Sequence, residues 1–228
     1  MGGLLVLALS GVVVLAGLLG GATASVAFLT GGATTTASFA TGTWSSATTR
    51  YLHNNPTPPV GNTTAQFNLA LDGTIPTAGT LFNYDTNCDS VAGRVIQRNT
   101  GAVTEATTCR YATWRTAAFA AAAVLSGTAS LEISARKAGS TGGTNPTLRA
   151  WLRDFDPGTG TYVELGNASL AITTDSTSPF ALYTFSIPVS GTVATGHRIE
   201  LKLVAFGGGR NVNIAYDTAA YPSTLTIP

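Results

Sequence analysis

Charged residues are scarce in this chain. Lys, Arg, Asp and Glu make up 10% of its 228 residues, where about 25% is usual in soluble domains. The first 49 residues contain none of them, and the first charged side chain is that of Arg50. The 12 basic and 11 acidic residues are spread along the chain without a basic stripe. We therefore expect no nucleic-acid partner. With so few charges, the surface would consist largely of Thr, Ser, Gly and Ala, which is typical of exported or glycosylated proteins.

The sequence also lacks the signatures of catalysis. It contains no GxSxG nucleophile motif, no HExxH motif and no phosphate-binding glycine loop. Its two histidines, His53 and His197, lie far apart and in no metal or triad pattern, and we interpret His197 as a turn residue that opens a strand. Asp154, Asp156 and Glu164 are candidates for paired carboxylates of a glycosidase, but they flank a turn that they would simply make soluble. The sequence therefore predicts that the protein is not an enzyme and uses no cofactor.

Only two cysteines are present, Cys88 and Cys109, with 20 residues between them. They do not have the CxxC spacing of a metal or redox site. In an exported chain, an even and minimal count favours a disulfide, which would contribute about 3 kcal/mol through the loop that it closes. The alternative is a pair of buried reduced thiols.

Two further short motifs are weak. Asn62 and Asn167 each begin an Asn-x-Ser/Thr sequon, which predicts glycosylation in an exported protein, although two sequons are also expected by chance in a Thr-rich chain. Residues 85–89 place oxygen-bearing side chains at alternate positions, as a calcium loop does. The glycine and the closing glutamate of such a loop are missing, where Ser90 and Ile96 stand. We interpret this segment as a hydrogen-bonded turn and expect no metal.

The N-terminus, by contrast, is rich in hydrocarbon. Residues 1–29 are apolar or small throughout, and no face of such a segment favours exposure to water. As a helix, residues 2–29 would be about 42 Å long, enough to cross a bilayer, and their glycines would let neighbouring helices approach closely. The alternative is a signal peptide cut after Ala24, but the positive charges that precede a signal peptide are absent.

A hydrophobic N-terminal helix joined to a β-domain resembles the architecture of type IV pilins and archaellins. This resemblance covers residues 1–30, with Leu5 where bacterial pilins usually carry glutamate. Residues 24–30 and 37–44 also resemble the leader junction of biofilm-fibre proteins of the camelysin type, which polymerise by donating an N-terminal strand. Both resemblances imply a surface fibre. In a helical filament core the assembly residues would be the large apolar side chains Leu4, Leu5, Val12, Val13, Leu15, Leu18, Leu19, Val26 and Phe28.

The rest of the chain shows the period of two that predicts β-strands. The clearest strand is residues 197–206, where Ile199, Leu201 and Leu203 alternate with charged residues. Residues 148–153 alternate in the same way, and residues 156–160 predict a hairpin turn. For the alanine run at residues 117–124, a short helix is the alternative, because Ala is the best helix former. The remaining strand candidates are residues 131–135, 161–165, 169–173, 182–189, 211–216 and 223–227.

Together these patterns predict a mainly β protein, an antiparallel β-sandwich of jelly-roll type preceded by an N-terminal hydrophobic α-helix. The helix would span residues 1–30 as filament core or leader, an extended joint residues 31–50, and the sandwich residues 51–228. We interpret the chain as a structural subunit of an extracellular, pilus-like filament at the cell surface. Its partners would be copies of itself in a helical polymer, and the membrane during assembly.

A carbohydrate-binding or adhesion module is the alternative function. It would be secreted or membrane-anchored, with the apolar head as a cleaved signal peptide or anchor, and its partners would be surface glycans. Sugar rings bind on exposed aromatic side chains. The candidates for such a platform are Trp44, Trp114, Trp151, Tyr162 and Tyr183.

Overall fold

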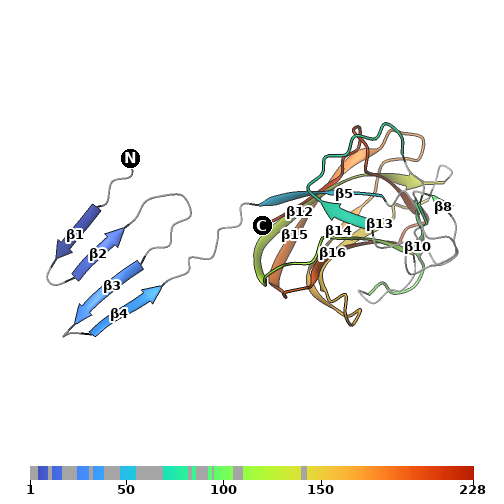
Figure 1. The fold of residues 1–228 in the computed structure, drawn as a ribbon. Coiled ribbons are helices and arrows are strands. Elements are labelled where there is room, and N and C mark those ends of the chain that lie inside the picture. The colour runs from blue at the N-terminus through green and yellow to red at the C-terminus, as the bar shows by residue number, and fades with distance from the viewer. Residues whose placement is uncertain are drawn as a thin grey trace. The chain divides into compact units, whose positions relative to one another are not determined.

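The computed structural model describes residues 47–54, 69–81, 84–85, 92–93, 95–104, 110–139 and 143–228, together with four strands nearer the N-terminus. The chain divides into two compact units, Met1–Ser46 and Ala47–Pro228, and each is described by itself (Figure 1). The functional groups discussed below all lie in the second unit.

The N-terminal unit contains strands and not the predicted helix. Its antiparallel sheet has the order β1-β2-β3-β4, and the strands are β1 (Leu5–Leu9), β2 (Val12–Ala16), β3 (Ser25–Thr30) and β4 (Ala33–Ser38). The helix prediction for residues 1–30 is therefore wrong. The physical reason is the content of β-branched side chains, as in the Val run of β2 and the Thr run of β4, which lose rotamer freedom in a helix and fit a pleated sheet.

The residues assigned to assembly follow this correction. Six of them lie on the strands, namely Leu5, Val12, Val13, Leu15, Val26 and Phe28, and Leu4, Leu18 and Leu19 lie outside the described residues. Strand β4 pairs with β3, with Thr30 opposite Ala33. Within the described residues, we find no helix of the length and apolarity that crossing a membrane requires.

The second unit is built on one large mixed sheet. In the described residues its path is β14-β13-β16-β11-β6-β5-β18-β12-β17-β9, with β10 added to β16 and β15 added to β12. A separate two-stranded ribbon joins β7 (Tyr84–Asp85) to β8 (Ala92–Gly93). The strands of the large sheet are β5 (Thr48–Leu52), β6 (Leu69–Asp72), β9 (Val95–Ile96), β10 (Arg98–Asn99), β11 (Tyr111–Arg115), β12 (Ala123–Ala138), β13 (Thr147–Phe155), β14 (Tyr162–Ala171), β15 (Ala181–Val193), β16 (Arg198–Phe206), β17 (Asn211–Ala215) and β18 (Thr224–Ile227).

The mainly β prediction is confirmed, and its details change in two ways. The sheet is mixed, because β10 runs parallel to β16 and β6 runs parallel to β11, while the other pairs are antiparallel. The short helix considered for residues 117–124 is wrong: β12 begins at Ala123, and the alanines before it lie in irregular structure. A run of this length cannot repay the cost of helix nucleation without packing of its own.

The sheet curls on itself (Figure 1), and the buried hydrophobic residues of its described strands form one core cluster. Alternation along β16 buries one set of side chains completely, with Leu201 and Leu203 at 0% exposure. The same core holds Leu131 of β12 and Phe185 of β15, from the other half of the sheet. Non-polar burial of this kind contributes about 25 cal/mol per Å², so the core explains why the two halves face each other.

Strands β14 and β15 approach each other closely at Gly166. A Cβ atom placed on Gly166 would collide with the carbonyl oxygen of Pro188 on β15. The register of β14 also shifts here, since Leu152 faces Gly166 and Arg153 faces Glu164, which marks a β-bulge. Glycine at this position is therefore a packing requirement of the curl.

Replacing Gly166 with Ala tests this close approach. We expect Gly166→Ala to lower the free energy of unfolding by about 1–3 kcal/mol, because the added methyl group forces β14 and β15 apart. Denaturant unfolding of the full chain measures the change. Gly73→Ala is the matched control: nothing lies within 4 Å of a Cβ at Gly73, so its stability should stay within about 0.5 kcal/mol of wild type. Equal effects of the two substitutions would contradict the proposed packing.

Candidate functional site

The side chains of β16 that face away from the core include a buried charge. Glu200 is 0% exposed and lies opposite Arg115 of β11 and Arg153 of β13 in the sheet register. Arg115 Nε donates to Glu200 Oε2 at 2.5 Å, and Arg153 Nη2 donates to Glu200 Oε1. A carboxylate without water needs such partners, because desolvation costs several kcal/mol per ion. Each guanidinium is also covered by a ring, Arg115 by Phe155 at 3.5 Å and Arg153 by Tyr162 at 3.9 Å.

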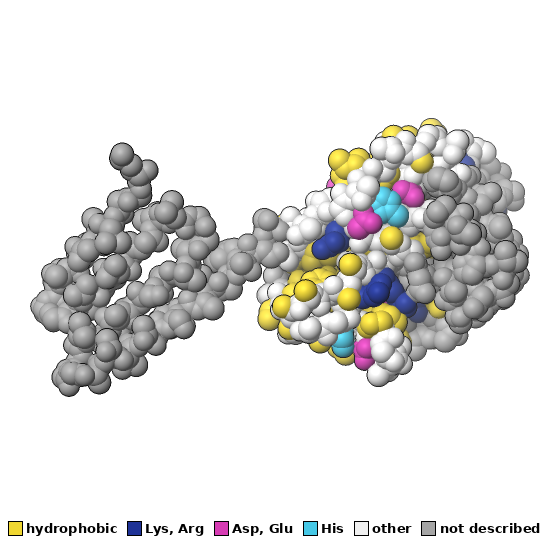
Figure 2. Space-filling view, viewed as in Figure 1, with side chains coloured by type: hydrophobic (Ala, Val, Ile, Leu, Met, Phe, Trp, Pro, Cys, Tyr) yellow, Lys and Arg dark blue, Asp and Glu magenta, His cyan; other side chains and the backbone are white. Residues whose placement is uncertain are grey.

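A cleft of about 580 Å³ opens beside this cluster. It is formed by β6, the ends of β11 and β13, the start of β16, and the residues that follow β11 and β13. Figure 2 shows Lys and Arg side chains among hydrophobic ones on the face that also displays both histidines. The cleft is lined by Leu69, Ala70, Leu71, Asp72, Arg115, Thr116, Ala117, Phe155, Pro157 and Arg198.

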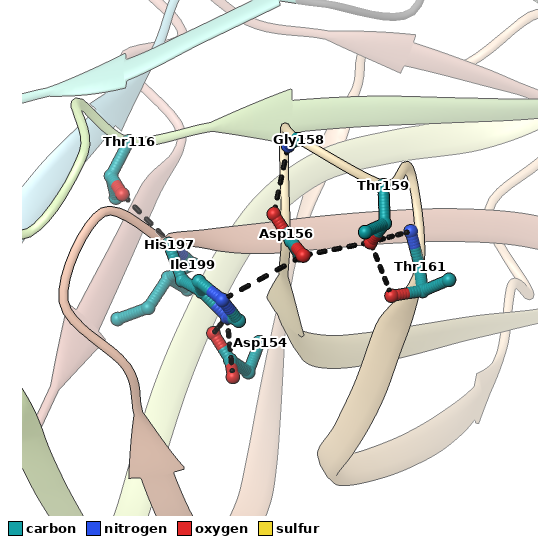
Figure 3. A network of polar contacts seen from close by, with 8 residues as sticks. All are labelled: Thr116, Asp154, Asp156, Gly158, Thr159, Thr161, His197 and Ile199. Carbon is teal, nitrogen blue, oxygen red and sulfur yellow. Dashed lines mark hydrogen bonds and ion pairs between the residues drawn. The ribbon is translucent and has the colours of Figure 1, made fainter.

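His197 and Asp154 form a pair where β13 ends and β16 begins, and the residues next to them in the chain, Arg198 and Phe155, line the cleft. His197 Nδ1 lies 2.9 Å from both carboxylate oxygens of Asp154 (Figure 3). The other ring nitrogen, Nε2, lies 4.0 Å from Asp156 Oδ2. The antiparallel pairing of β13 with β16 places Asp154 opposite Ile199, and this register brings the two residues together.

Asp156 is held by the turn that follows β13. Its carboxylate accepts hydrogen bonds from Thr159 Oγ1 and Gly158 N, each at 2.7 Å (Figure 3). The bond from the Thr159 side chain, then that from the Gly158 backbone, lowers the pKa of Asp156 below its usual 3.8, so the carboxylate is ionised at neutral pH. The predicted turn at residues 156–160 is confirmed, since Gly160 N donates to Asp156 O at 2.9 Å.

His53 lies between two carboxylates. Its Nδ1 is 2.8 Å from Asp217 Oδ1, and its Nε2 is 3.2 Å from Asp72 Oδ1. Asp217 has a φ of 59°, in the left-handed region that is costly for a non-glycine residue; its other oxygen accepts from Asn54 N at 2.7 Å. These bonds tie the end of β5 to the end of β6 and to the segment after β17. A smaller pocket of about 310 Å³ lies next to His53 and Asp217.

Asp72 is the acidic residue of the cleft. Partial burial raises its pKa, but hydrogen bonds from Thr74 and the neighbouring His53 outweigh burial, so the pKa falls below 3.8. The backbone bond from Thr74 N to Asp72 Oδ1 measures 2.7 Å. Asp72 is therefore an anion, and one of its carboxylate oxygens, Oδ1, already contacts Thr74 N and His53 Nε2.

Several predicted site residues lie outside the described residues, among them Cys88, Cys109, Asn62 and Trp44, so the disulfide and the first sequon stay predictions. Most of the segment considered for calcium, residues 85–89, also lies there, and the described part of the chain contains no group of three or more acidic, His or Cys side chains that could hold a metal. Asn167 is exposed on β14, and its amide donates to Glu164 Oε1 at 2.5 Å; glycosylation at Asn167 stays a prediction.

The four described aromatic residues that we considered for a sugar platform make other contacts. Trp114 is 0% exposed and packs edge-on against Tyr216, and Trp151 is 3% exposed. Tyr162 lies under Arg153. The hydroxyl of Tyr183 is bonded to the backbone nitrogens of residues 173 and 174.

The structure brings His197 to two of the three carboxylates that the sequence analysis had grouped. Asp154, Asp156 and His197 converge, whereas Glu164 lies apart from them and contacts Asn167. The interpretation of His197 as a plain turn residue missed this grouping. A signal was present, because Asp154 stands near the end of one predicted strand and His197 at the start of another. Only the pairing of those two strands, which the sequence does not state, makes them neighbours.

No protein-family model and no curated protein sequence matches this chain, but solved structures share its fold. One is an aminopeptidase from the marine sediment archaeon Thaumarchaeota archaeon, with a TM-score of 0.51 and 13% identity over 84% of this chain and 38% of that one. An α-amino acid ester hydrolase has a TM-score of 0.50 and 14% identity over 80% of this chain and 36% of its own. A CocE/NonD family hydrolase from Staphylococcus aureus has a TM-score of 0.51 and 12% identity over 86% of this chain and 39% of its own.

These likenesses correct the functional predictions. The similar structures are hydrolases and not pilins, so the resemblance to pilins, archaellins and camelysin-type proteins is wrong. The same finding overturns the filament subunit, the alternative of a carbohydrate-binding or adhesion module, and the expectation that the protein is not an enzyme. At 12–14% identity the likeness concerns the fold, and this chain spans less than two fifths of the length of the proteins that it matches. An extracellular location stays a prediction.

Removing the buried carboxylate tests the charge cluster. We expect Glu200→Gln to lower the free energy of unfolding by about 3 kcal/mol, because it takes away the anion that Arg115 and Arg153 share. Glu132→Gln, at an exposed position of β12, is the matched control and should change stability by no more than about 0.5 kcal/mol. Chemical denaturation of both variants at neutral pH measures the difference, and a Glu200→Gln protein as stable as the control would contradict the account.

The lowered pKa of Asp72 predicts a contribution to acid stability. Because the folded-state pKa lies below the unfolded value, the stabilisation is fully present above the unfolded pKa and is lost as the pH falls through the lower folded value. Asp72→Asn should therefore flatten the loss of stability below about pH 4. Thermal unfolding of wild type and variant between neutral and acidic pH measures this. Parallel curves for the two proteins would show that Asp72 has no such role.

Proposed function

We propose that this chain acts in the hydrolysis of an ester or amide bond, with His197 as the general base. Two observations support the proposal. Solved structures with this fold include an aminopeptidase, an α-amino acid ester hydrolase and a CocE/NonD family hydrolase. The observation that carries it is the pair of His197 and Asp154, with Nδ1 bonded to the Asp154 carboxylate and Nε2 4.0 Å from Asp156 Oδ2.

The pairing assigns a tautomer to His197. An ionised carboxylate only accepts hydrogen bonds, so Nδ1 carries a hydrogen and donates it in the hydrogen bond to Asp154. In the neutral ring, Nε2 then has a lone pair and is able to take a proton. A base whose ring is oriented by a carboxylate in this way is the arrangement on which acyl hydrolysis relies.

The attacking atom in this proposal is the oxygen of a water molecule. Among the described residues, the side chains in polar contact with the two imidazole rings are carboxylates, and none is a serine or a cysteine. The distance of 4.0 Å between His197 Nε2 and Asp156 Oδ2 suits a water bonded to both. Asp156 would orient the water and His197 would take its proton as the oxygen attacks the acyl carbon. The proton then passes from His197 to the leaving oxygen or nitrogen as the acyl bond breaks, which gives an acid and an alcohol or amine.

We also propose that the curled sheet is a sandwich of jelly-roll type. The common core of the β13 and β16 half with the β12 and β15 half supports this arrangement. The close approach of β14 to β15 at Gly166 supports it as well, because two stacked sheets bring their inner side chains together in this way.

The proposal is tested by assaying the full chain on phenylalanine methyl ester and phenylalanine p-nitroanilide. We expect His197→Gln to lower kcat/KM by about 100-fold or more, the usual effect of a lost general base. Asp154→Asn should lower kcat with little change in KM, because it orients the base and touches no substrate. Glu164→Gln, an exposed carboxylate outside the group, is the control and should keep wild-type rates. Turnover no faster than the uncatalysed reaction, or equal turnover by wild type and His197→Gln, would overturn the proposal.

A further inference from the structure

We propose that the cleft beside Glu200 is a binding site for an organic carboxylate that carries an apolar group, with Arg198 as its main anion-binding residue and Arg115 beside it. This goes beyond the proposed function, because it assigns a ligand class and a binding residue to the cleft. It rests on that function only for the choice of probe, since hydrolysis of an ester or peptide releases a carboxylate.

Arg198 is the first reason. In the described part of the chain it forms no ion pair, and its Nε is buried without a hydrogen-bond acceptor. Within the described residues, the guanidinium donates one hydrogen bond, from Nη1 to the carbonyl oxygen of Thr116 at 3.4 Å, near the limit for such a bond. Arg115 and Arg153, in contrast, both bind Glu200. A guanidinium that lines a cleft and forms no ion pair with the described residues can bind an anion there.

Arg115 adds to the positive charge at the same end of the cleft. Both arginines line it, and they are near enough to repel each other. Burial is the main cause that lowers the pKa of Arg115 to about 10. Tyr111 opposes this shift, and the positive charge of Arg198 adds to it. Arg115 is still a cation at neutral pH. An anion placed against Arg198 would relieve this repulsion, and the fork of a guanidinium matches the two oxygens of a carboxylate.

The acidic residue of the cleft does not remove this preference. Asp72 accepts a hydrogen bond from Thr74 N at 2.7 Å and lies 3.2 Å from His53 Nε2. Its charge is therefore met by its own neighbours. Asp72 and the two arginines all line the cleft, and in this proposal the carboxylate of the ligand binds at the arginines.

The remaining lining explains the apolar part of the ligand. Phe155, Pro157, Leu69 and Ala117 contribute hydrocarbon next to the two arginines. The volume of about 580 Å³ falls within the range typical of small-molecule sites. A small inorganic anion would leave these groups in contact with water, whereas a carboxylate with an aliphatic or aromatic group would cover them.

Calorimetric titration of the full chain with N-acetyl-L-phenylalanine tests the site. We expect saturable binding of this acid, and much weaker binding of its neutral amide, of acetate and of inorganic phosphate. Arg198→Gln should weaken binding by about 10-fold or more. The matched control is Arg149→Gln. Arg149 lies on β13, donates a hydrogen bond to Ser169 and is outside the cleft. This variant should bind the acid within about twofold of wild type.

Three results would overturn the proposal: equal affinity for the acid and its amide, equal affinity for phosphate and the acid, or unchanged binding by Arg198→Gln. Absence of saturable binding in wild type would overturn it too. The outcome is separable from that of the hydrolysis assay, because binding needs no turnover. His197→Gln should bind the acid as wild type does, so a chain without hydrolytic activity that binds the carboxylate would support this site while removing the proposed function.

Discussion

The buried carboxylate of Glu200 constrains the whole of this face of the sheet. It lies opposite Arg115 on one side and Arg153 on the other, so a single anion joins three adjacent strands, β11, β16 and β13. A slip of one residue in either pairing would move every side chain of a strand to the other face and leave Glu200 in the core. The charge cluster and the hydrophobic core therefore demand the same register.

That register also sets the positions of the functional groups. Ile199, the residue before Glu200 on β16, lies opposite Asp154 of β13. Arg198, the residue before Ile199, lies opposite Phe155. Arg198 thus reaches the cleft, while His197 just beyond it meets Asp154. A candidate base and a candidate anion-binding residue are neighbours in the chain, and the alternation of side chains sends them to different surroundings.

The sequence was informative where local physics decides. Alternation in residues 197–206 and 148–153 predicted both faces of β16 and β13, and Asp156 and Gly160 close the turn that their residue types suggested. It failed where hydrophobicity alone was the guide, because residues 1–30 are apolar enough for a helix and β-branched enough for strands. The cleft was beyond reach, since β6 and β11 contribute to it through a parallel pairing of distant segments.

The central claim is that Asp154 prepares His197 to act as a base through Nε2. The most direct measurement is the pair of ¹⁵N chemical shifts of the His197 ring in the neutral state, in a chain that has only two histidines. The account predicts a protonated Nδ1 and an unprotonated Nε2. A neutral ring with its proton on Nε2, and with Nδ1 unprotonated against Asp154, would contradict it.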